Sequence, residues 1–123
     1  MQDNKNTEKY VTITGFWHYY GRELFKPGRV FSCEKEPNNH YDDEAIKVVD
    51  DDFGTVGYVA NSINTRAIGT YSAGKIGVHV KKKFKIEVMF VTASKVICRV
   101  VDGFKKKEKI KNENIIKDEE QMI

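Results

Sequence analysis

Short segments of apolar and β-branched residues, several alternating strictly with polar residues, constrain this chain more than any other feature. Successive side chains of a β-strand point to opposite faces, so this alternation predicts strands with one buried face. The expected strands share this pattern and are residues 10–14, 30–34, 45–49, 55–59, 76–80, 84–91 and 95–101. A chain divided in this way folds mainly as antiparallel β-structure.

Turn residues and one predicted helix separate these strands. Asp50-Asp51-Asp52-Phe53-Gly54 predicts a turn that ends in a left-handed glycine, and Thr92-Ala93-Ser94 predicts a hairpin turn. Asn61 or Ser62 is a suitable N-cap for a helix through residues 63–68 that ends at Gly69. We therefore expect a mainly β protein with one or two short helices.

The predicted fold is a small, strongly bent antiparallel barrel, since closure protects the strand edges of a small sheet. The natural comparison is the five- or six-stranded oligonucleotide-binding (OB) barrel, which carries its ligands on one exposed face. The 123 residues suit one domain, which we expect at residues 10–104. Residues 1–9 are polar after Met1 and predict a disordered segment, and residues 105–123 predict a basic, marginally helical tail.

The composition excludes several classes of protein. Of the residues, 40% are hydrophobic and 32% are charged. No run of eighteen apolar residues occurs, and the first thirty residues contain no apolar run of the kind expected in a signal peptide. A cytoplasmic protein without a membrane partner is the expectation. Cys33 and Cys98 lie in apolar alternating runs and are predicted to be buried; one disulfide is possible, but their spacing supports neither a zinc site nor a redox site.

The charges are distributed unevenly along the chain. Residues 32–62 contain eight acidic residues and two lysines, a net charge of −6, whereas residues 63–111 contain thirteen basic and three acidic residues, a net charge of +10. A basic surface is the electrostatic footprint of a nucleic-acid binder, although the acidic half opposes phosphate wherever it shares that face. Charge alone favours nucleic acid weakly.

Two loops hold the most unusual side chains. Residues 16–20 contain four aromatic rings and His18, more than one face of a small core absorbs. We expect Trp17 in the core, Tyr19 pointing outward, and one of Tyr19 and Tyr20 buried. The central loop, residues 36–46, reads Glu-Pro-Asn-Asn-His-Tyr-Asp-Asp-Glu-Ala-Ile, and its proline and asparagines predict a structured bend between strands. The alternative is a solvated turn without a function.

Six carboxylates flank one predicted strand and raise the alternative of a metal-dependent nuclease. Residues 42–44 and 50–52 supply them. Five intervening strand residues separate the two clusters by roughly 16–20 Å, which is too far for one metal site. No nucleophile with a partner base is evident elsewhere in the sequence. We therefore expect no metal, no cofactor and no enzymatic activity.

Four motifs together resemble the HIRAN domain, which occurs alone in bacteria and phages and fused to helicase-like DNA translocases in eukaryotes. They are Val-Thr-Ile-Thr-Gly at residues 11–15, Trp-His-Tyr-Tyr-Gly at 17–21, the central loop continuing through Lys47-Val48, and Val-Gly-Tyr-Val at 56–59. The resemblance covers about residues 10–102 and implies a modified OB barrel. It also implies binding of single-stranded DNA at a free 3′ end, as in DNA-binding members of the family.

The resemblance implies roles for particular residues. Tyr19 and Tyr41 would hold the terminal base, and Asp42 would accept a hydrogen bond from the terminal 3′-hydroxyl. His18, Asn38 and Asn39 would reach phosphates, with Tyr20 and Tyr58 completing the surface. Apart from the resemblance, the charge of the lysine run Lys81, Lys82 and Lys83 makes it a further candidate for phosphate binding. Two residues depart from the family pattern: His40 replaces the usual proline, and Glu44 replaces the usual asparagine.

Other interpretations stay open at this stage. Asp42 can serve only as a turn cap, and the lysine run can be a solvated strand end. The whole chain can instead be a protein-interaction module of a DNA repair or phage complex, anchored by the aromatic residues at 16–20. Either function allows a helicase or nuclease as the partner protein.

Overall fold

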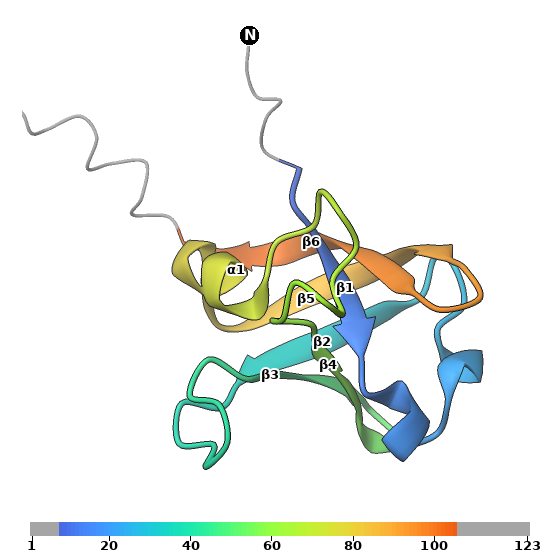
Figure 1. Ribbon diagram of the computed structural model, residues 1–123, viewed down its shortest axis with the longest axis horizontal. Coiled ribbons are helices and arrows are strands. Elements are labelled where there is room, and N and C mark those ends of the chain that lie inside the picture. Colours follow the sequence, from blue (N-terminus) through green and yellow to red (C-terminus); the bar gives the residue numbers. More distant parts are fainter. Residues whose placement is uncertain (1–7, 106–123) are drawn as a thin grey trace, which may run out of the picture.

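The structure, a computed structural model, describes residues 8–105, which form a closed barrel of antiparallel strands with one α-helix at its end (Figure 1). The strands are β1 (Tyr10–Thr14), β2 (Val30–Lys35), β3 (Ile46–Asp50), β4 (Gly54–Val59), β5 (Val80–Val91) and β6 (Val96–Phe104). Their order around the barrel is β1-β4-β3-β2-β5-β6, and β1 pairs with both β4 and β6. The predicted mainly β, antiparallel barrel is confirmed.

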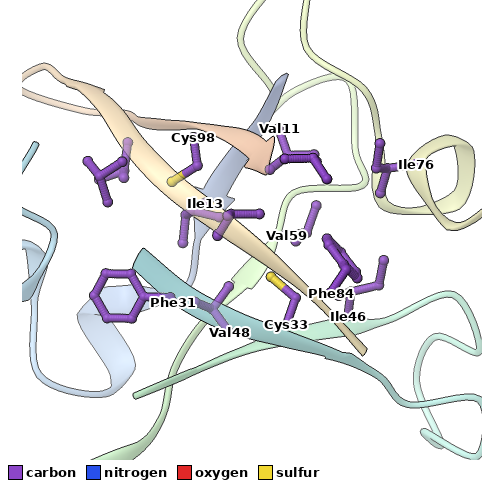
Figure 2. Packing of buried hydrophobic residues seen from close by; sticks show 14 of the residues in the cluster. Val11, Ile13, Phe31, Cys33, Ile46, Val48, Val59, Ile76, Phe84 and Cys98 are labelled. Atoms are coloured by element: carbon purple, nitrogen blue, oxygen red, sulfur yellow. The ribbon is translucent and has the colours of Figure 1, made fainter. Parts of the chain in front are cut away.

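Alternating side chains fill the barrel. Val11, Ile13, Cys33, Val48 and Phe84 are among the buried residues, and Figure 2 shows how they converge from different strands. Both cysteines are free and fully buried, as predicted. Burial raises the pKa of the Cys33 thiol well above its usual value and that of Cys98 to about 12, so both thiols stay protonated.

The predicted positions of the helix and of one strand are wrong. Residues 62–69 form turns, and the α-helix is α1 (Ala73–His79), which includes most of the segment predicted as a strand at 76–80. Ser72 is its N-cap, and its side chain accepts the Lys75 amide at 3.2 Å. Ala73 and Ile76 are buried at helical spacing, whereas Val78 is 61% exposed, so the apparent period of two at 76–80 misled the prediction.

A lysine fastens the end of α1 to the barrel. The Lys35 Nζ atom, at the end of β2, donates to the carbonyls of Gly77 and Val80, both at 2.8 Å. These bonds satisfy carbonyl groups that a helix terminus leaves without partners. Burial lowers the pKa of Lys35 from its usual value. The helix is therefore held both by its buried apolar residues and by a cation at its C-terminal end.

The predicted terminal segments fall largely outside the described residues. Of the segment 1–9, the structure describes Glu8 and Lys9, and the Lys9 carbonyl accepts the Val100 amide at 2.9 Å. Of the tail 105–123, only Lys105 is described, and its amide donates to the His79 carbonyl at 3.0 Å. Among residues 8–105, no helix is long and apolar enough to cross a membrane.

Gly103 provides a test of barrel packing. Its φ is +97°, and a Cβ atom there would lie 2.4 Å from the Phe84 Cβ and 2.6 Å from the Phe84 Cα. Gly103→Ala is expected to cost about 2–4 kcal/mol of unfolding free energy, because both the backbone conformation and the close approach of β5 oppose a side chain. Urea denaturation followed by circular dichroism measures this loss.

Gly69→Ala is the matched control, since Gly69 has a similar φ of +92° but open space around its Cα. Its expected cost is about 1 kcal/mol, from the backbone conformation alone. Equal losses in the two variants would show that contact with β5 does not restrict position 103.

Candidate nucleic-acid interface

One row of side chains crosses the outer surface of five strands. Strand pairing aligns Glu34 with both Lys83 and Lys47, Lys47 with Tyr58, and Tyr58 with Thr14. We call these residues the outer row: Lys83, Glu34, Lys47, Tyr58 and Thr14. Each of these residues has at least one strand neighbour buried in the barrel, so alternation directs the outer row away from the core.

Tyr19 lies beside Tyr58, one place from the Thr14 end of the outer row. It follows the short 3-10 helix η2 (Phe16–His18), and its ring centroid is 6.5 Å from that of Tyr58, with the two rings inclined by 37°. Gly15 at φ +74° and Gly21 at φ +81° bracket the aromatic segment, and these backbone angles favour glycine. The chain thereby leaves β1 and carries Tyr19 onto the outer surface, where its side chain is half-exposed.

The Glu36 carboxylate joins the outer row to the central loop. Its Oε1 accepts hydrogen bonds from the Tyr58 hydroxyl at 2.9 Å and from Asn39 Nδ2 at 3.1 Å, and its Oε2 lies 3.8 Å from Lys47 Nζ. Burial, the bond to Glu36 and the neighbouring Tyr19 raise the pKa of Tyr58, so its hydroxyl remains a donor. Glu36 therefore orients the Tyr58 ring that faces Tyr19.

Side-chain bonds to the backbone give the central loop a defined shape. Asn39 Oδ1 accepts the amides of Tyr41 at 2.8 Å and Asp42 at 3.1 Å, and Asp42 Oδ1 accepts the Glu44 amide at 2.9 Å. These are the local bonds by which Asn and Asp stabilise turns. The Tyr41 ring itself is 97% exposed. The predicted structured bend is thus observed, with an uncovered aromatic ring on an ordered backbone.

A hollow of about 440 Å³ lies between the central loop and β5. Its border includes Asn38, Asn39, Lys47, Tyr58 and Lys82. Lys83 lies next to it in the outer row, whereas Lys81 neither borders the hollow nor pairs with β2. Of the predicted lysine run, the structure therefore brings Lys82 and Lys83 to this surface and leaves Lys81 exposed elsewhere.

The aromatic segment differs from the sequence predictions in two ways. Trp17, predicted in the core, is 68% exposed, and the buried ring is that of Phe16. Neither Tyr19 nor Tyr20 is buried; Tyr20 packs on Phe53, with the centroids 4.8 Å apart. Both errors have one cause: residues 16–18 form a 3-10 helix and residues 19–20 a turn, and strand alternation applies to neither.

The predicted site residues are therefore divided. Asn38, Asn39, Tyr58 and Lys82 border the hollow, and Tyr19 packs on Tyr58. Tyr41 and Asp42 lie on the central loop but do not line the hollow. Tyr20 belongs to a separate aromatic pair at the β3–β4 turn, and His18 is exposed on η2. Sequence reasoning missed Lys47 and Glu36, although the alternation of Ile46, Lys47 and Val48 already directed Lys47 outward.

Asp50, one of the carboxylates that suggested a metal site, has other partners. Asp50 Oδ1 accepts from Arg29 at 2.6 Å, and its Oδ2 accepts the amides of Asp52 and Phe53. Those two amide bonds and the Arg29 guanidinium lower the pKa of Asp50. Within residues 8–105, no group of three histidine, cysteine or acidic side chains is arranged to hold a metal ion.

A small closed barrel with lysines and paired aromatic rings on one outer face is typical of nucleic-acid-binding modules. The family model of the HIRAN domain matches residues 7–95. The chain belongs to the HIRAN domain family, whose members bind DNA and are not themselves catalytic.

Two solved structures share the fold. The HIRAN domain of human HLTF is 20% identical, with a TM-score of 0.56, over 85% of this chain and 81% of that chain. A Lactobacillus plantarum protein is 16% identical, with a TM-score of 0.51, over 76% of this chain and 90% of that chain. No curated protein matches this sequence.

The lysines of this surface are expected to determine the salt dependence of DNA binding. Replacing Lys47, Lys82 and Lys83 together with glutamine should reduce the slope of log affinity against log salt by about 0.7 for each phosphate that the variant no longer neutralises. Fluorescence anisotropy with a labelled single strand at several salt concentrations measures that slope.

Lys26→Gln is the control, because Lys26 is exposed beyond the second 3-10 helix, η3 (Arg22–Leu24), and pairs only loosely with Glu23 at 3.8 Å. An unchanged slope in the triple variant would mean that phosphates do not approach the outer row.

Proposed function

We propose that this chain is a single-stranded DNA-binding module that recognises free 3′-hydroxyl ends. The proposal rests on two observations: the Tyr41 ring is uncovered on a loop ordered by Asn39, and the Tyr19–Tyr58 ring pair is joined to the same loop by the bond from Tyr58 to Glu36. Aromatic rings on a defined backbone suit unstacked bases, which exist in single strands and at strand ends.

Stacking provides the affinity in this proposal. The half-exposed Tyr19 and the exposed Tyr41 offer ring faces to the terminal base, and every base has a face that can stack. Tyr58 supports Tyr19 from the sheet, since its hydroxyl is fixed by Glu36. Such contacts tolerate any base sequence.

Asp42 provides the end recognition. Its two oxygens each accept one hydrogen bond, from the Glu44 amide and from Asn61 Nδ2, and a carboxylate has acceptor positions beyond these two. A terminal 3′-hydroxyl can donate to one of them, whereas a 3′-phosphate brings negative charge against the carboxylate. The turn-stabilising bond of Asp42 is therefore compatible with a second role in binding.

Lys47, Lys82 and Lys83 supply positive charge for the phosphates that follow the terminal nucleotide. The side chains of Asn38 and Asn39 border the same hollow and add hydrogen-bonding groups. A module of this kind suits a helicase or nuclease that acts at strand ends, and we propose such an enzyme as its partner.

A protein-interaction module is the second candidate function. Trp17 is 68% exposed, Tyr20 51% and Phe53 48%, and none of these rings belongs to the outer row. Exposed aromatic side chains are frequent anchors of protein interfaces. Under this function alone, the protein would not distinguish single strands by their ends.

Removing either stacking ring is expected to weaken DNA binding. Tyr19→Ala and Tyr41→Ala should each cost about 1–3 kcal/mol of binding free energy, the typical contribution of one base stacked on an aromatic ring. Titration of a short labelled strand with a free 3′ end measures the loss. Tyr20→Ala is the matched control and should have little effect, because Tyr20 packs on Phe53 instead.

If Tyr19→Ala and Tyr41→Ala both fold and bind as the unmodified protein does, the stacking proposal fails. A loss confined to Tyr20→Ala would instead place the binding surface at the β3–β4 turn.

The charge of Asp42 is expected to set the preference for the end. Asp42→Asn should weaken binding to a 3′-hydroxyl end modestly and relax the rejection of a 3′-phosphate, because the negative charge is removed while an acceptor oxygen remains. Asp42→Ala should abolish the preference, since a hydrogen bond to a charged group is worth about 1.5–3 kcal/mol. The measurement is the affinity ratio for the two ends, taken beside the melting temperature.

A lowered melting temperature with an unaltered ratio would assign Asp42 to the loop alone. That result would leave the aromatic residues as the only candidates for end recognition.

A further inference from the structure

Asn61 lies between the central loop and α1, and its side chain is bonded to both. Its Nδ2 donates to Asp42 Oδ2 at 3.3 Å and to Glu44 Oε1 at 3.0 Å. Its Oδ1 accepts the Gly74 amide at 2.9 Å. One side chain thus connects the carboxylate proposed to read the 3′-hydroxyl with the first turn of the helix.

The partners of Asn61 admit only one orientation of its amide group. Reversing the group would direct Oδ1 at the two carboxylates and Nδ2 at the Gly74 N–H, so that like groups would oppose each other at every contact. The side chain is therefore locked, and its Nδ2 fixes the direction of Asp42 Oδ2. It also gives two neighbouring negative charges a common donor.

The N-terminal turn of α1 leaves an amide and space for the contact with Asn61 and Glu44. Ser72 accepts the Lys75 amide, which leaves the Gly74 amide for Asn61. A Cβ atom at position 74 would lie 2.6 Å from Glu44 Oε1, so a glycine there lets the loop carboxylate approach the helix. Lys35 and the buried Ile76 hold α1 on the barrel. The contact of Asn61 with α1 therefore fixes the position of the central loop relative to the barrel.

We propose that Asn61 is a positioning residue for recognition of the 3′-hydroxyl, an inference that rests on the proposed function. It holds the Asp42 carboxylate at a fixed distance from the stacking rings, so the terminal hydroxyl meets an acceptor already in place. Without it, only the Glu44 amide holds the Asp42 carboxylate, at Oδ1, and the repulsion between the Asp42 and Glu44 carboxylates is no longer offset. Preorganisation of this kind strengthens binding without any contact to the ligand.

The test compares two single strands that differ only in the terminal hydroxyl, one ending in a 3′-hydroxyl and the other in a 3′-deoxy nucleotide. Their charges are equal, so the affinity ratio reports the hydroxyl contact alone. Asn61→Asp keeps an acceptor for the Gly74 amide but replaces the donors to Asp42 and Glu44 with a third negative charge beside them. Asn61→Ala removes all three bonds without adding a charge. Asn64→Ala, an exposed asparagine three residues further along, is the matched control.

We expect the unmodified protein and Asn64→Ala to prefer the 3′-hydroxyl strand. Asn61→Asp and Asn61→Ala should reduce that preference by about threefold to tenfold, the range that one hydrogen bond provides. Affinity for the 3′-deoxy strand should change less, because stacking and phosphate contacts remain. If Asn61→Ala does not fold, Asn61→Asp carries the comparison, since it keeps the bond to α1.

Two results would overturn the inference, and they are distinguishable. A normal preference in folded Asn61→Asp, beside a normal preference in the unmodified protein, would show that Asn61 serves stability alone and would leave the proposed function standing. Equal affinity of the unmodified protein for the two strands would remove the proposed function, and the inference with it.

Discussion

The double pairing of β1 is the constraint on which the rest of the structure depends. This five-residue strand bonds to β4 on one side and to β6 on the other, and so closes the barrel. Because the barrel is closed, successive residues of each strand point alternately into the barrel and out to its surface. Val11 and Ile13 fill the core from β1, and the same alternation in the other strands aligns Lys47 and Tyr58 outside. The candidate surface is therefore a consequence of the register that closes the barrel.

The acidic segment at residues 32–62 repels DNA phosphates less than its net charge suggests. Glu34 and Glu36 lie within 4.0 Å of the same Lys47 ammonium. Asp50 is paired with Arg29 away from the outer row, and Asn61 binds both Asp42 and Glu44. Five of the eight carboxylates therefore have a cation or a hydrogen-bond donor beside them. Lys47 is already counted in the net charge of the segment, but Arg29 lies outside it and offsets one further negative charge.

The strands and the fold class could be predicted from the sequence because alternation in a sheet is a local property. Asp50 to Gly54 and Thr92 to Ser94 form turns as expected, and Cys33 and Cys98 are buried. The register between strands could not be predicted, since it depends on partners distant in the chain. The convergence of Tyr19, Tyr58 and the central loop was visible only through the family motifs.

The errors concern segments whose structure is decided by tertiary contacts. Residues 62–69 have a helical pattern, but the Thr12 hydroxyl accepts the Ala67 amide at 3.0 Å and lies 2.9 Å from the Thr70 hydroxyl, which ties the segment to β1 as turns. Asn61 was predicted to cap a helix in this segment and instead binds the first turn of α1. Propensity is a weak prior wherever such contacts compete with it.

The two buried thiols make the folded protein unreactive toward thiol-alkylating reagents. The sequence has no other cysteine, and a thiol reacts with alkylating reagents only as the thiolate and only when a reagent can reach it. Cys33 and Cys98 come from different parts of the barrel wall, on β2 and β6. Covalent labelling of either sulfur thus requires that the wall itself opens. The rate of alkylation of Cys33 and Cys98 therefore reports how often the barrel opens transiently. A cysteine introduced on the surface would be the only thiol that a reagent reaches readily in the folded protein.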